Sequence, residues 1–154
     1  MRSRLTRASI PPITAQDKTA MTESRPLLPL VSDAEADPRA QAVFDDIRAV
    51  RKTDRVNNFW RALANDPDGL ERTWAEVKAV MGEGALDPLV KELVYIAVSV
   101  TNGCEYCIRS HSAAARAKGL DDAGLAELFA VIALANKTNA LVTGLRPPVD
   151  EAFR

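Results

Sequence analysis

The chain has 154 residues, two cysteines, one histidine and a formal net charge of −1. That length fits one domain with a substantial core, and the charge gives no electrostatic basis for binding nucleic acid or an anionic membrane. The first twenty residues hold no apolar stretch, and the apolar run 93–100 is far shorter than a membrane span. We therefore expect a soluble protein of a reducing compartment, the cytoplasm, with no nucleic-acid or membrane partner.

The first 33 residues are polar, contain four of the nine prolines and show no helical or strand period. They predict an N-terminal tail, with Met21 as an alternative start, followed by an extended arm. The arm carries Leu27, Leu28 and Leu30, which we expect to pack on a neighbouring surface. A helical domain of residues 34–154 follows.

From residue 34 onward, helix signals recur at short intervals and no alternating strand pattern occurs. Asp-Pro dipeptides, which are typical of a capping residue followed by a first-turn proline, occur three times in this region. The expected helices cover residues 37–52, 56–64, 66–82, 87–101, 104–118 and 121–142. The sequence thus predicts an all-α, single-domain bundle of about six helices.

Cys104, Cys107 and His111 fall within an arc of about 60° on one helix face. Gly103 ends the preceding helix, so both thiols are expected in the first turn of the next one, where free N–H groups and a partial positive charge favour thiolate. His111 can accept the thiol proton or, once protonated, stabilise the thiolate. The pattern predicts a reactive dithiol site, in which one cysteine condenses with a sulfenic acid formed on the other.

Glu92 is the second unusual residue, because it lies inside the apolar segment 89–98. Ile96, Ser99 and Gly103 project from nearly the same side, so the face that carries Glu92 runs toward the cysteines. We expect burial to raise the pKa of the Glu92 carboxyl, which would let it pass protons near neutral pH.

Other interpretations of the same residues stay open. The cysteines could be inert core residues, or Cys104, Cys107 and His111 could bind zinc with Glu92 or water as the fourth ligand. Structural zinc sites usually bring two ligand pairs on separate elements, and the sequence has no second pair. Covalent haem attachment is excluded because Ile108, not histidine, follows the second cysteine. We expect no cofactor and no bound metal, and keep a non-enzymatic redox- or zinc-responsive module and a disulfide reductase as alternatives.

The spacing Glu-x11-Cys-x2-Cys-x3-His, followed by an alanine-rich helix and a long final helix, resembles the alkylhydroperoxidase D family of the carboxymuconolactone decarboxylase-like superfamily. The resemblance covers roughly residues 59–144. It implies a helical fold that assembles as a homotrimer or homohexamer, and a thiol-dependent peroxidase that takes a peroxide substrate and a thiol or protein electron donor. By that resemblance Cys107 would attack the peroxide, Cys104 would resolve the product, and Glu92 and His111 would form the proton relay.

Tyr106 departs from the pattern of the founding family members, which carry a second histidine between the cysteines. Many peroxidase-related members share this tyrosine. A phenol that titrates at about 10 is a poor base at neutral pH, although Tyr106 can still donate a hydrogen bond. The decarboxylase branch uses a different site without the cysteine pair, so the dithiol argues against that activity.

Overall fold

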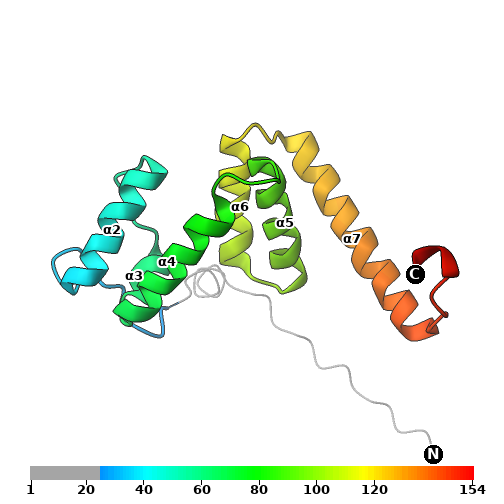
Figure 1. Ribbon diagram of the computed structural model, residues 1–154, viewed down its shortest axis with the longest axis horizontal. Coiled ribbons are helices and arrows are strands. Elements are labelled where there is room, and N and C mark those ends of the chain that lie inside the picture. Colours follow the sequence, from blue (N-terminus) through cyan, green and yellow to red (C-terminus); the bar gives the residue numbers. More distant parts are fainter. Residues whose placement is uncertain (1–24) are drawn as a thin grey trace, which may run out of the picture. The chain divides into compact units, whose positions relative to one another are not determined.

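The computed structural model describes residues 25–154 (Figure 1), so the predicted tail and the alternative start at Met21 lie outside the described residues. Within residues 25–154 there is no strand, which confirms the all-α prediction. The helices are α2 (Pro38–Arg51), α3 (Asn58–Leu63), α4 (Pro67–Met81), α5 (Pro88–Thr101), α6 (Glu105–Ala117), α7 (Asp122–Leu145) and the 3-10 helix η1 (Glu151–Phe153). The chain divides into two compact units, the first ending at Ala75 and the second starting at Glu76. The predicted domain boundary at residue 34 stays a prediction.

All three Asp-Pro dipeptides start helices, as predicted. Asp37 and Asp87 each accept a hydrogen bond from the backbone N–H two residues later, at 2.9 and 2.8 Å. Asp66 accepts one from the N–H three residues later, at 3.1 Å. Each such cap stabilises its helix by about 1 kcal/mol, because it satisfies an N–H that has no partner within the helix.

The first unit has an aromatic core between α2, α3 and the beginning of α4. Phe44, Trp60, Leu70 and Trp74 are all buried. The two indole rings meet edge to face with centroids 5.3 Å apart, and the Trp74 indole N–H donates to a carboxylate oxygen of Asp46 at 2.7 Å. The buried indole therefore keeps a hydrogen-bond partner.

The arm that precedes α2 is fixed through polar groups, and Leu30 is the one half-buried leucine among the three predicted to pack. Leu27 and Leu28 are exposed within the chain. The N–H of Val31 donates to the Arg61 carbonyl at 3.1 Å, and the Arg61 guanidinium returns a hydrogen bond to the Val31 carbonyl at 3.0 Å. Arg61 also pairs with Asp33 at 2.8 Å, so one arginine holds both the backbone and the carboxylate of the arm.

The second unit packs α5 along α6, and α7 also contacts α5 (Figure 1). Its core is built on Ile96, Ala115 and Ile132, one residue from each helix. The partly buried side chains that pack against this core are Leu89, Ala97, Val100, Leu120 and Leu128. This core sets which faces of α5 and α6 meet, and those faces carry the predicted site.

Helix α7 differs from its prediction in length and in exposure. It continues three residues past the predicted end at 142, with Gly144 inside it, and Arg146 caps it in the left-handed conformation at φ 50° before Pro147. A glycine inside a helix costs about 1 kcal/mol relative to alanine and does not end it. Of its residues only Ile132 is fully buried.

By length and composition, α7 is also apolar enough to cross a membrane. No single apolar run of the sequence approaches that length, and the expectation of no membrane partner stays a prediction. In α7 the apolar residues are separated by small and polar ones. The polar run 136–139, which includes Lys137, lies inside the helix, and such residues are costly at the centre of a bilayer.

Replacing Asp33 should loosen the arm. Hydrogen bonds from Arg48 and Arg61 lower the pKa of Asp33 from 3.8 to about 2. A lowered folded-state pKa contributes stability above the unfolded value, and this contribution is lost as the pH falls through about 2. At pH 7, Asp33→Asn should therefore speed hydrogen exchange at the Val31 N–H by up to about fivefold, which corresponds to about 1 kcal/mol for an exposed ion pair.

Asp45→Asn is the matched control, since Asp45 pairs with Arg48 at 2.8 Å on the surface of α2 without holding the arm. It should leave the exchange rate at Val31 nearly unchanged. Equal effects of the two substitutions would contradict the role given to Asp33.

Candidate active site

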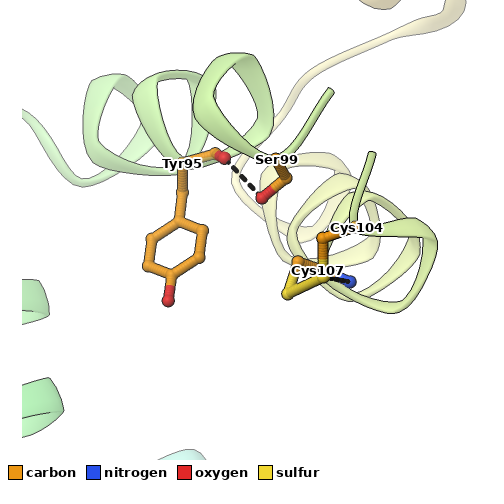
Figure 2. Close-up of a disulfide and its surroundings, with 4 residues drawn as sticks. All are labelled: Tyr95, Ser99, Cys104 and Cys107. Atoms are coloured by element: carbon orange, nitrogen blue, oxygen red, sulfur yellow. Dashed lines mark hydrogen bonds between the residues drawn. A yellow bond between two sulfur atoms is a disulfide. The ribbon is translucent and has the colours of Figure 1, made fainter. Parts of the chain in front are cut away.

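The two cysteines lie at the start of α6, as predicted, directly after a tight turn. Gly103 has a φ of +68°, a conformation that side-chain-bearing residues rarely adopt, and the Cys104 N–H then donates to the Ser99 carbonyl at 2.9 Å. Cys104 is the N-cap residue of α6, and its sulfur accepts from the Cys107 N–H at 3.4 Å. The two sulfurs are joined in a disulfide, which Figure 2 shows beside Ser99 of α5. Geometry therefore permits the dithiol–disulfide cycle that the spacing predicted.

Glu92 and His111 meet between α5 and α6. Nδ1 of His111 lies 2.7 Å from Oε2 of Glu92. The Glu92 side chain is only 7 % exposed and that of His111 is 21 % exposed. Because an ionised carboxylate only accepts hydrogen bonds, Nδ1 carries the proton, and Nε2 is left to accept or donate another one. The structure thus joins two of the predicted residues into a hydrogen-bonded pair.

Lys118 is a third member of this cluster that sequence reasoning missed. Its Nζ donates to Oε1 of Glu92 at 2.9 Å, so each carboxylate oxygen has its own cationic or ionisable partner. Lys118 caps the C-terminal end of α6, seven residues after His111. Seven residues are two helical turns, so the stripe that contains Cys104, Cys107 and His111 continues to Lys118. That spacing is the signal by which the sequence could have revealed it.

The pKa of Glu92 differs in direction from the expectation. Burial is the largest influence and raises the pKa, but hydrogen bonds from His111 and Lys118, together with their charges, outweigh it. The net effect lowers the pKa of the Glu92 carboxyl below its usual value. The prediction that Glu92 is buried was right. The prediction of a raised pKa was wrong, because it did not include the hydrogen bond and the charge of Lys118. Glu92 is therefore a fixed carboxylate at neutral pH.

Two tyrosines lie beside the site. The Tyr95 ring stacks on the His111 imidazole, with centroids 3.6 Å apart and planes inclined by 19°. Tyr95 was not predicted, although it follows Glu92 by three residues on α5, which places the two on neighbouring positions of the helix surface. The predicted residue Tyr106 lies in the first turn of α6 and is 45 % exposed.

The arrangement offers acid–base and redox chemistry side by side. In the described part of the chain, no group of three or more His, Cys, Asp and Glu side chains is placed to hold a metal ion. The four residues of the zinc alternative are used in two other ways, the sulfurs in the disulfide and Glu92 with His111 in the hydrogen-bonded pair. In such an arrangement an imidazole can accept the proton of a thiol on the same helix and later return it.

The chain was compared with known proteins. No curated protein matches it significantly. Residues 67–150, more than half of the chain, match the model of the carboxymuconolactone decarboxylase family. The crystal structure of the alkylhydroperoxidase AhpD core from Rhodospirillum rubrum is 59% identical, covers 84% of this chain and 98% of its own, and superposes with a TM-score of 0.81. The chain therefore belongs to the carboxymuconolactone decarboxylase family, as an alkylhydroperoxidase D-like member.

Proposed function

We propose that the protein is a thiol-dependent peroxidase that cycles between a Cys104/Cys107 dithiol and the corresponding disulfide. The observation that carries the proposal is that two features occur on one helix. Cys104 and Cys107 are joined at the start of α6, and His111 of the same helix is hydrogen-bonded to the buried carboxylate of Glu92. The first supplies the electrons for reducing a peroxide, and the second moves the proton that the attack requires.

In the first step the Cys107 thiol loses its proton to Nε2 of His111, one helical turn away. The thiolate attacks the distal oxygen of the peroxide, so that a sulfur–oxygen bond forms and the oxygen–oxygen bond breaks. Cys107 becomes a sulfenic acid, and the imidazolium returns its proton to the departing alkoxide, which leaves as an alcohol. Glu92 stabilises the imidazolium between these two transfers.

In the second step Cys104 attacks the sulfenic sulfur of Cys107, which forms the disulfide and releases water. Its sulfur is well placed to react as a thiolate, because it caps α6 and accepts the Cys107 N–H. A thiol donor, which is either a small molecule or a protein, then reduces the disulfide by supplying two electrons and two protons. This regeneration fits a reducing compartment, for which we propose the cytoplasm.

Two findings support peroxide reduction over decarboxylation within this family. The similar structure from Rhodospirillum rubrum is named an alkylhydroperoxidase, and this chain carries a cysteine pair that a decarboxylation does not need. Tyr106 stands between the cysteines with a half-exposed side chain, where its hydroxyl can donate a hydrogen bond to a substrate oxygen. In the proposed cycle Tyr106 is a hydrogen-bond donor, and the proton relay is left to His111.

The cysteine assignments are tested by single substitutions. Cys107→Ser should abolish turnover of hydrogen peroxide and organic peroxides under a dithiol reductant, because the attacking sulfur is gone. Cys104→Ser should react once with each peroxide and then over-oxidise, since no second sulfur condenses with the sulfenic acid. Turnover is followed by peroxide loss, and the oxidation state of each variant by intact-protein mass spectrometry.

Full activity of Cys107→Ser would show that the assignment of the attacking sulfur is wrong. Slow, substoichiometric oxidation of the unchanged protein, together with bound zinc in the purified material, would favour the redox- or zinc-responsive module over the enzyme.

His111→Ala should move the reactivity of the attacking thiol to higher pH. Without the imidazole, the proton of Cys107 has no acceptor within one turn, and less thiolate forms at a given pH. The second-order rate with peroxide should fall by about 10²–10⁴-fold at pH 7, the usual contribution of a positioned general base. An unchanged pH–rate profile would count against the relay.

We further propose that the protein assembles as a homotrimer or homohexamer through α7. One side of this helix carries an exposed apolar stripe formed by Val131, Leu134, Leu141 and Leu145. Successive members are three, seven and four residues apart, which places them on one face of the helix. Exposed apolar stripes of this kind are typical of surfaces that another chain covers.

Charging the stripe should therefore dissociate the assembly. The double substitution Leu134→Glu and Leu141→Glu is expected to shift the molar mass measured by light scattering from a multiple to that of one chain. Lys137→Glu, on the same helix but at a polar position, should leave the mass unchanged. A single-chain mass for the unchanged protein, or its recovery only with detergent, would contradict the proposal.

A further inference from the structure

The carboxylate of Glu92 is held from two sides, and only one of them belongs to the proposed relay. His111 takes Oε2 at 2.7 Å and Lys118 takes Oε1 at 2.9 Å. Lys118 points at the buried carboxylate that orients the proposed base, His111. It is not needed for packing, since the core of this unit is apolar and lies on Ile96, Ala115 and Ile132.

We propose that Lys118 is a positioning residue of the relay: its ammonium group holds the Glu92 carboxylate in place and in its charged form, which sets the proton affinity of the Glu92–His111 pair. This inference rests on the proposed function in one respect, namely that the relay serves the reduction of a peroxide. The contact itself acts on the thiols through His111, whether their partner is a peroxide or a disulfide.

The first part of the argument is orientation. A carboxylate bound on one oxygen can rotate about its last bond, whereas a carboxylate bound on both oxygens cannot. With Oε1 fixed by Lys118, Oε2 stays in line with Nδ1 of His111. The imidazole then keeps one tautomer, with Nε2 as the nitrogen that exchanges a proton with the thiol.

The second part is charge. Within residues 25–154, the charged groups that act on the Glu92 carboxyl are His111 and Lys118, and both come from α6 and its C-terminal cap. From α7 the core receives the apolar side chains Leu128 and Ile132. If Lys118 lost its charge, burial would favour the protonated carboxyl, and a neutral Glu92 would no longer stabilise the imidazolium that forms when His111 takes the thiol proton. The cation therefore keeps the relay able to accept the thiol proton near neutral pH.

The third part is cost. The Lys118 side chain is 36 % exposed, so its aliphatic stem covers the site while part of the side chain remains in water. Gly119, with a φ of +101°, turns the chain directly after it, which ends α6 at the level of Glu92. The lysine thus reaches a buried carboxylate without being fully desolvated itself.

The experiment measures alkylation of Cys107 by iodoacetamide across pH in the reduced protein, with Cys104→Ser as the common background so that one thiol reacts. Lys118→Met should move the midpoint of the rate–pH curve up by about one unit, the scale of a single close charge. Lys118→Arg should restore most of the shift. Lys137→Met, the same change at an exposed lysine of α7, should leave the midpoint in place, and His111→Ala gives the response of a lost relay.

A midpoint unchanged in Lys118→Met, while His111→Ala shifts it, would overturn the inference. A purely structural role would lower the melting temperature without moving the midpoint, and this outcome also overturns it. If circular dichroism shows that Lys118→Met is unfolded, Lys118→Gln takes its place with the same expected shift, since it keeps a donor and loses the charge. A shifted midpoint in a protein that does not turn over peroxides would uphold the role of Lys118 and refute the peroxidase.

Discussion

A buried carboxylate between two helices is the constraint on which the site depends. Removing the charge of Glu92 from water costs several kcal/mol, and the chain offsets this with two hydrogen bonds from one helix, at 2.7 and 2.9 Å. Such clusters contribute little net stability compared with an apolar core. Here His111 and Lys118 both have to face Glu92, so α6 has one rotation against α5. That rotation also determines where the cysteines lie.

The same two helices are joined by a turn that places the sulfurs. The last turns of α5 present Ser99, whose carbonyl receives the Cys104 N–H, and Gly103 supplies the left-handed residue that the reversal requires. The cysteines begin α6 where its N–H groups are free, and the Cys107 N–H points at the other sulfur. The cysteine pair, His111 and Glu92 therefore lie on facing sides of one antiparallel helix pair, and their positions depend on the contact between α5 and α6.

Much of this could be predicted from the sequence, and the failures have physical reasons. Asp-Pro dipeptides mark helix starts because capping and a fixed φ are local effects, and the Cys104, Cys107 and His111 stripe follows from helical period alone. The pKa of Glu92 could not be predicted, because it is the difference between a large desolvation effect and two contacts that depend on how α6 docks. The stacking of Tyr95 on His111 is likewise a contact between helices. The exposure of α7 could not be predicted from its sequence, since the apolar composition of a helix does not tell whether residues of its own chain or of another chain cover it.

The chain contains one histidine, and this restricts how its proton chemistry works. A site with a second histidine between the cysteines can divide proton acceptance and proton return between two imidazoles. With Tyr106 at that position, the proposed relay has only His111 to perform both transfers. Without Lys118, the buried Glu92 carboxylate would tend to take up a proton itself and would no longer stabilise the imidazolium, whereas without Glu92 the imidazole would be free to rotate. The contact with Lys118 avoids both outcomes, because it keeps Glu92 charged and in line with His111.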